Sequence, residues 1–276
     1  MENVKKLYMI SFFYSLIPAY VIERLFWQER GMSISMVVYC EIIYALVITI
    51  SEIPSGILAD RFGRKKLLII DCAFGVIEMV IIVFANEFWM FAVAVFFAGI
   101  GKSLSSGSKN ALLYDSLVLS KKETDFEKFL GRITAIEFLG YLLAALSGSL
   151  LTNYFDFSFN YILSAGSMTI ALLMTFLLKE PIIKTKQEQT MGIIDYTRQA
   201  LTFFKSQPVV LMYCLTGVTL GASMIYVDEF WQLIMNDIGI GVAFFGIISG
   251  LQMVARIPGN IIAYKLKNKF QYRNLF

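Results

Sequence analysis

The sequence predicts an all-α polytopic membrane protein, and three observations support that prediction. First, 57% of its 276 residues are hydrophobic and the mean hydropathy is +0.66, whereas soluble domains are roughly 45–50% apolar. Second, the apolar residues form runs of about 20, the length that an α-helix needs to cross a bilayer. Third, only 16% of the residues are charged, and they gather between these runs.

Eight apolar runs are long enough to span a membrane. They lie near residues 7–28, 34–59, 66–86, 88–118, 131–152, 158–178, 208–235 and 241–264. Lys5 and Lys6 precede the first run as in a signal peptide, but no small-residue cleavage site follows, so we interpret the run as a retained helix. The fourth run is the longest, and we expect its last turns to project from the membrane around Asp115.

The basic residues between the runs predict the orientation of the chain. Before the first run and after the second, fourth, sixth and eighth runs, the loops are rich in lysine and arginine. The opposite loops contain Glu29, Arg30, Glu87, Asp156 and Asp237, of which only Arg30 is basic. Because basic loops stay in the cytoplasm, the N-terminus is predicted to be cytoplasmic, in a plasma membrane of the bacterial kind.

The runs and loops divide the chain into three predicted parts. Residues 1–179 form a six-helix transmembrane domain, 180–207 a cytoplasmic linker, and 208–276 an incomplete second transmembrane domain. The second part of the linker places Ile193, Leu201 and other apolar residues at helical spacing. This spacing favours an amphipathic helix at the membrane surface, and a plain tether is the alternative.

An internal repeat relates the two transmembrane domains. An offset of 204 positions pairs Phe26-Trp27-Gln28 with Phe230-Trp231-Gln232 and Ile53-Pro54 with Ile257-Pro258. One gapless offset therefore aligns both ends of a two-helix unit, which predicts that the last two helices are a second copy of the first two.

The stretch 52–66 ends a long apolar run in a cluster of charges. Each of these charges would cost roughly 2.5–3.5 kcal/mol at the centre of a bilayer, so the stretch is predicted to be a tight hydrophilic turn between two membrane helices. Its pattern is Gly-x-x-x-Asp-Arg-x-Gly-Arg-Lys, formed by Gly56, Asp60, Arg61, Gly63, Arg64 and Lys65. The pattern resembles the signature between the second and third helices of the major facilitator superfamily.

The resemblance implies a fold, a function and a set of contacts. The implied fold is the complete first six-helix bundle of that family plus the first two helices of the second bundle, so we expect the chain to be a fragment or a truncated product. In the family, the aspartate matching Asp60 caps a helix of the other half, and the arginine matching Arg64 bridges to an acid at the end of helix 4, here Asp115. These residues would form a latch that holds one conformation. The alternative is that the basic residues only set the topology.

Charged residues within the runs are the candidates for proton or substrate coupling, because an intramembrane charge is costly. They are Glu23, Glu41, Glu52, Glu78, Lys102, Lys109, Glu137, Asp228 and Glu229. Lys102 and Glu137 are predicted to lie at similar depth and to form a pair, with Lys109 on the same face as Lys102; this pair either lines a polar cavity or is only structural. Family helices 1 and 7 line the cavity, which favours Glu23, Asp228 and Glu229, unless these residues reach the headgroups.

Further features refine the expected function. Glu52, Pro54 and Gly56 resemble a subgroup described as permeases or efflux proteins. The fifth run has Gly140, Ala144 and Gly148 at four-residue spacing, a groove for close helix packing, but it lacks the Gly-Pro signature of family antiporters.

The sequence as a whole predicts a secondary transporter that works by alternating access, with proton-coupled efflux of small, largely apolar compounds. Its partners would be the lipid bilayer, a small-molecule substrate and protons, with no nucleic acid, cofactor or metal. The chain has no histidine and no nucleophile motif, so an enzyme is not expected. The alternative function is a non-transporting truncated remnant, or a half-transporter that needs a partner chain.

Overall fold

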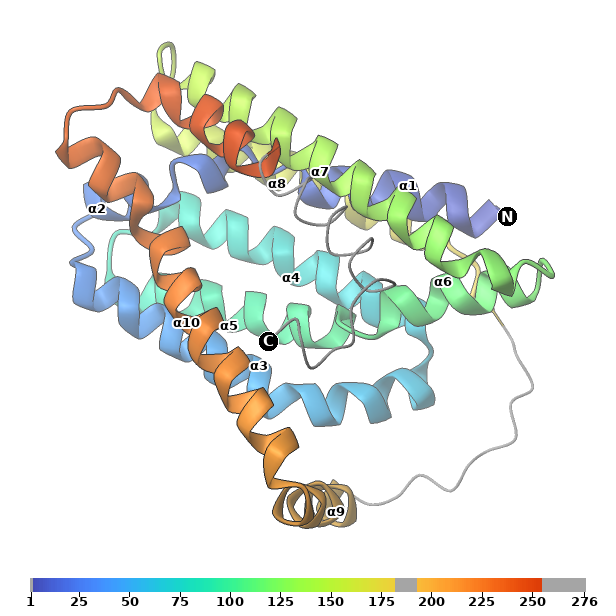
Figure 1. Cartoon of the computed structure of the whole chain (residues 1–276). Helices are drawn as coiled ribbons and strands as arrows, with labels where there is room; N and C mark the ends of the chain where they lie inside the picture. The colour runs from blue at the N-terminus through green and yellow to red at the C-terminus, as the bar shows by residue number, and fades with distance from the viewer. Residues whose placement is uncertain (1, 182–192, 255–276) are drawn as a thin grey trace.

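The computed structural model describes residues 2–181 and 193–254, and over these residues it is built from helices and their connections (Figure 1). In chain order the elements are α1 (Glu2–Ser15), the 3-10 helix η1 (Pro18–Val21), α2 (Glu23–Glu29), α3 (Ile34–Phe62), α4 (Arg64–Phe84), α5 (Phe88–Ser105), α6 (Ser108–Val118), η2 (Glu123–Asp125), α7 (Phe126–Leu151), α8 (Phe157–Phe176), α9 (Ile193–Ser206), α10 (Pro208–Asp237) and η3 (Val242–Phe244). A helical segment continues from η3, so that an apolar helix covers Val242–Val254. The predicted all-α fold is confirmed.

The helices agree with the predicted membrane runs. Five helices are each long and apolar enough to cross a membrane, and α1 with η1 and α2 makes a sixth, bent span. α10 covers the seventh predicted run, and the Val242–Val254 helix begins the eighth. The rest of the eighth run and the second Ile-Pro pair of the repeat, Ile257-Pro258, lie outside the described residues.

The first predicted run is broken, where the sequence predicted one uninterrupted helix. α1 ends at Ser15, η1 begins at Pro18, and α2 leaves the direction of the preceding span by 47°. Proline has no N–H to donate to the previous turn, and it disfavours helical backbone in the residue before it. Ile17 accordingly has φ −117° and ψ 85°, outside the helical region.

The fourth predicted run is one span but two helices. α5 ends at Ser105 and α6 starts at Ser108, with Ser106 and Gly107 between them. Serine and glycine are weak helix formers, and serine hydroxyls compete for backbone carbonyls. Ser108 Oγ donates to the Leu104 carbonyl at 2.8 Å, across the break.

The first eight α-helices form one bundle. α4 packs between α5 and α8, α3 lies on α5, and α1 lies against α7 and α8. The predicted small-residue groove of α7 is confirmed, and the first helix occupies it: a Cβ added at Gly140 would lie 2.9 Å from the Phe12 carbonyl oxygen, and Gly148 faces the Pro18 carbonyl. These glycines allow α7 to approach α1 and η1 closely.

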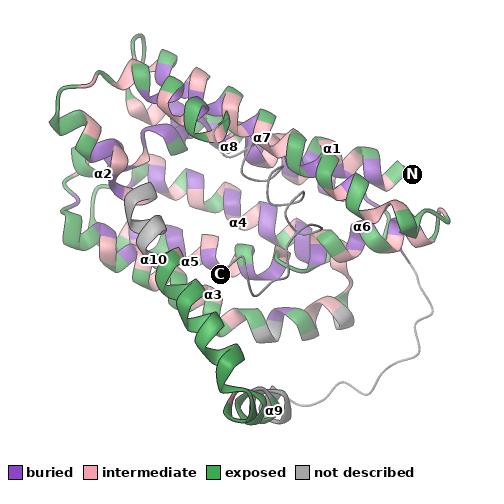
Figure 2. Cartoon of the chain, viewed as in Figure 1, coloured by how far each residue is buried: buried purple, intermediate pink, exposed green. Residues whose placement is uncertain are grey.

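α10 touches the bundle at one end only, whereas the Val242–Val254 helix packs on α7, where Gly246 faces the Ala145 carbonyl. Residues 208–220 of α10 are all exposed, whereas Phe230 and Leu233 near its other end are buried against α2 and its neighbours (Figure 2). The predicted linker helix is present as α9, which lies at the far end of α10 (Figure 1). Exposed leucine, isoleucine and phenylalanine side chains cover the outside of the helices, as expected of surfaces that face lipid.

Candidate functional site

The charged turn between α3 and α4 is held by the bundle around it. Gly63 joins the two helices with φ +88°, a backbone angle that favours glycine. Arg64 forms an ion pair with Asp115 of α6, and its guanidinium also donates to the Ala111 carbonyl at 2.8 Å. The contact implied by the family resemblance is therefore present, while its role as a latch stays a prediction. The side chains of Asp60 and Arg61 are outside the described residues, and Gly56 has open space around it in the described part of the chain.

A carboxylate that the sequence analysis placed in the linker binds this turn. The Glu180 side chain accepts from the backbone N–H groups of Arg64 at 2.8 Å and Lys65 at 2.7 Å. These are the first free N–H groups of α4, which have no partner within the helix and attract negative charge. The Lys65 ammonium donates in return to the Phe176 carbonyl at the end of α8, at 2.9 Å.

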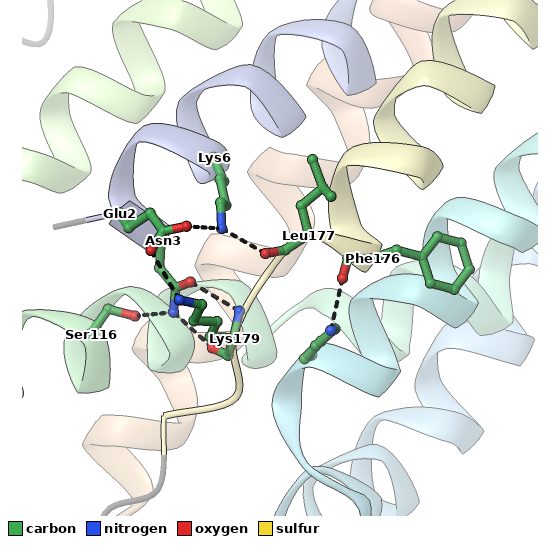
Figure 3. A network of polar contacts seen from close by, with 8 residues as sticks. Glu2, Asn3, Lys6, Ser116, Phe176, Leu177 and Lys179 are labelled. Atoms are coloured by element: carbon green, nitrogen blue, oxygen red, sulfur yellow. Dashed lines mark hydrogen bonds and ion pairs between the residues drawn. The ribbon is translucent and has the colours of Figure 1, made fainter.

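A second network at the same end ties α1 to α6 and to the residues that follow α8 (Figure 3). Lys6 bonds to Glu2 at 2.6 Å and to the Leu177 carbonyl at 2.7 Å. Asn3 donates to Ser116 at 3.0 Å and to the Lys179 carbonyl at 2.7 Å, and accepts from the Lys179 N–H at 3.0 Å. These bonds hold α1, α6 and the residues that follow α8 together at the charged end of the bundle.

The predicted ion pair between Lys102 of α5 and Glu137 of α7 is wrong in its basic partner. Glu137 binds Lys109 of α6, and not Lys102. Lys109 lies seven residues beyond Lys102, about 10 Å along a helix, so the depth predicted for Glu137 was wrong and Glu137 lies beside Lys109. Both lysines nevertheless line the same cavity of about 290 Å³ within the bundle, as their predicted common face requires.

Asp71 of α4 is a site residue that the sequence analysis missed. It is 5% exposed, lines the 290 Å³ cavity, and accepts a hydrogen bond of 3.2 Å from the Tyr14 hydroxyl of α1. The signal was available, because an aspartate inside the apolar run 66–86 is costly unless it is bonded or functional. Glu52, a predicted candidate, instead lies on the exposed side of α3 and accepts from Ser106 at 2.7 Å.

A larger cavity of about 440 Å³ lies between the first six-helix unit and the last two described helices. Its charged lining residues are Glu23, Arg24, Glu41, Glu78, Lys102 and Glu229, and its aromatic ones are Tyr14, Tyr20, Trp27, Tyr44, Tyr141 and Trp231. Lys102 and Tyr14 also line the 290 Å³ cavity. The described lining residues thus include more carboxylates than cations, and aromatic rings line the same cavity.

Arg24 organises one end of the 440 Å³ cavity. It is 4% exposed, and its guanidinium binds Glu41 of α3 at 2.5 Å and also Glu229 of α10. Glu23 lies 3.8 Å from it, and the guanidinium carbon lies 4.7 Å from the centre of the Trp27 ring. Glu23 and Glu229, for which the headgroup position was the alternative, converge instead on this buried arginine. The side chain of Asp228 is outside the described residues.

Comparisons with known proteins agree on one family. A family model described as "Major Facilitator Superfamily" matches residues 7–276. The chloramphenicol resistance protein CraA of Acinetobacter baumannii is 27% identical over 221 residues, 76% of this chain and 50% of CraA. The multidrug resistance protein MdtG of Salmonella paratyphi B is 22% identical over 222 residues, 79% of this chain and 52% of MdtG. The chain spans about half the length of these curated relatives.

Solved structures give the same fold. The nucleoside transporter NupG superposes with a TM-score of 0.80 at 13% identity, covering 98% of this chain and 69% of that one. A D-xylose-proton symporter gives a TM-score of 0.63 at 13% identity, covering 97% and 68%. At these identities the likeness establishes the fold and leaves the substrate open.

Proposed function

The chain belongs to the Major Facilitator Superfamily, and from this premise we propose that it forms the first half and part of the second half of a secondary transporter. The proposed activity is proton-coupled efflux of small molecules across the plasma membrane by alternating access. Residues 1–179 would act as one rocking unit and residues from 208 onward as part of the other, joined by the linker 180–207.

The 440 Å³ cavity is the observation that carries this proposal. Its wall combines residues of α1 to α5 and α7 with Glu229, Trp231 and Gln232 of α10, and with Ser249 and Met253 of the following helix. A cavity formed by both units changes its access when one unit rocks against the other, which is the requirement for alternating access. Its volume suits a small organic molecule, since ligand pockets measure about 300–1,000 Å³.

The charge of the cavity supports proton coupling. Arg24 is shared among three carboxylates, and Glu78 has no ion-pair partner within the described part of the chain. Unbalanced carboxylates in a low-dielectric cavity favour uptake of a proton or of a cationic group. Exchange of one for the other would couple outward movement of substrate to inward movement of protons. The names of CraA and MdtG, which refer to resistance, favour efflux over uptake.

The orientation and the turn complete the proposal. The basic ends that carry Arg64, Lys65 and Lys179 would face the cytoplasm by the positive-inside rule. The Arg64–Asp115 pair would stabilise one of the two conformations. The other residues of the same turn would contribute to this latch: Gly56, Asp60, Arg61, Gly63 and Lys65. Arg24 and its carboxylates would then lie at the opposite, external side.

Transport by the full-length protein in inverted membrane vesicles tests this function. With an imposed proton gradient we expect uptake of ethidium, a cationic aromatic dye, and loss of that uptake when a protonophore collapses the gradient. Glu78→Gln should abolish most of the gradient-driven uptake. Glu123→Gln, which changes an exposed glutamate of η2, should leave it unchanged and is the matched control. Uptake that ignores the protonophore, or that survives Glu78→Gln, would contradict proton coupling through this cavity.

A further inference from the structure

The break in the first helix leaves two backbone groups to be satisfied. In an uninterrupted α-helix the N–H of residue 24 donates to the carbonyl of residue 20. Here Ile22 separates η1 from α2 with φ −124° and ψ 8°. Both groups bond instead to one side chain of α10: the Arg24 N–H donates to Gln232 Oε1 at 3.0 Å, and Gln232 Nε2 donates to the Tyr20 carbonyl at 2.8 Å.

The amide of Gln232 therefore occupies the place of one missing helical hydrogen bond. Gln232 is 5% exposed, so these two bonds are made in the interior of the protein. Glu229 lies three residues earlier and thus on the same face of α10, and it binds the Arg24 side chain. Gln232 of α10 thus bonds to the backbone at the break, and Glu229 of α10 binds the side chain of Arg24.

We propose that Gln232 is a splint that keeps the first helix broken while α10 lies against it. When the two units separate at this end, the amide leaves, and the Tyr20 carbonyl and the Arg24 N–H bond to each other. The first helix then becomes continuous from Pro18 onward, because proline is tolerated in the first turn of a helix. This inference rests on the proposed alternating access and adds a positioning residue to it.

The physical reason is the cost of unpaired backbone groups in a membrane protein. A buried N–H or carbonyl without a partner is expensive where water is scarce. Opening at this end without a change in helix 1 would leave both groups dependent on entering water, whereas re-forming the helical bond satisfies both within the helix. A 3-10 turn such as η1 in the middle of a span often marks a hinge of this kind.

Native cysteines provide the first readout. Cys40 of α3 is 0% exposed and adjoins Glu41, while Cys72 of α4 is 1% exposed within the first unit. In the full-length protein with the exposed Cys214 changed to serine, a maleimide would be applied to right-side-out vesicles, and the modification of each cysteine followed by mass spectrometry. Gln232→Met keeps the length of the side chain and removes both hydrogen bonds.

We expect Gln232→Met to raise the rate of Cys40 modification about tenfold, since loss of two buried hydrogen bonds shifts the equilibrium toward the open state. Cys72 should not change. Gln28→Met is the matched control, because Gln28 is the repeat counterpart of Gln232 and is exposed. An unchanged Cys40 rate, or an equal rise at Cys72, would overturn the splint.

Amide hydrogen exchange tests the straightening of helix 1 directly. In Gln232→Met the Arg24 amide should stay protected, because it would bond to the Tyr20 carbonyl. Rapid exchange of that amide would mean that Gln232 is only a structural partner, and the proposal would be wrong. Neither readout needs a substrate. If both readouts give the expected results in a protein that transports no ethidium, the proposed efflux is rejected and this inference stands.

Discussion

Replacing Gly63 by alanine should destabilise the charged turn measurably. The backbone of Gly63 has φ +88° and ψ 149°, a region that is almost restricted to glycine and costs of order 1–3 kcal/mol for other residues. The added Cβ would also lie 2.9 Å from Cδ of Glu180, so the carboxylate must withdraw from the first turn of α4. Weakening that helix-end interaction adds about 0.3–1 kcal/mol.

The free energy of unfolding should therefore fall by about 1.3–4 kcal/mol on the sum of these two contributions. Reversible unfolding in mixed detergent micelles, followed by circular dichroism, measures this change. Gly166→Ala is the matched control, because Gly166 lies within α8, is exposed, and has open space around it in the described part of the chain. It should be neutral or slightly stabilising.

A double-mutant cycle separates the two contributions. Glu180→Ala removes both the carboxylate and the crowding, so Gly63→Ala in that background should retain only the cost of the backbone angle. If Gly63→Ala costs no more than Gly166→Ala, the turn does not depend on the positive φ. If its cost is the same in both backgrounds, Glu180 and Gly63 are not coupled, and the proposed crowding is wrong.

Four further predictions concern transport and packing. Asp60→Asn should abolish or strongly slow transport by the full-length protein while membrane insertion, measured by fractionation, stays normal; wild-type rates would reject the latch. Lys109→Met should destabilise the protein by about 1–3 kcal/mol, because the partly buried Glu137 carboxylate loses its partner, and Glu137→Gln in the same chain should recover much of this loss in detergent unfolding; absence of recovery would show that the pair is not the cause. Glu137→Gln alone should alter the proton dependence of transport, and an unchanged pH profile would leave Glu137 as a structural partner. Gly140→Leu should prevent the close approach of α7 to α1 and lower the melting temperature, whereas an unchanged melting curve would mean that the two helices can separate at no cost.

Local composition was enough to predict the membrane-spanning segments of this protein. Whether a segment spans a membrane depends on the summed hydropathy of about 20 consecutive residues, and this sum needs no knowledge of neighbours. The turn at Gly63 follows from the same local reasoning, whereas the partnership of Arg64 with Asp115 was expected only from the resemblance to the family. The small-residue groove of α7 was also visible as a local pattern, although its occupant was not.

Contacts between helices depended on breaks and rotations that the apolar pattern does not contain. Hydropathy does not fix the depth at which α5 and α6 lie against α7, and it is Lys109 and not Lys102 that lies opposite Glu137. Pro18 was visible in the sequence, but its effect on the direction of α2 decides where Arg24 points. A membrane run that looks continuous in hydropathy can therefore contain a break, because lipid responds to side-chain polarity and not to backbone direction.

The sequence by itself determined the fold class, the spans and the charged turn, because each of these follows from residues that are adjacent in the chain. Only the tertiary structure decided that Arg24 is buried among carboxylates of three segments, that Glu180 binds the start of α4, and that Gln232 bonds across the break in the first helix. These partners lie more than a hundred residues apart in the last two cases. Their meeting depends on the depth and rotation at which helices pack, and packing is a property of the whole bundle.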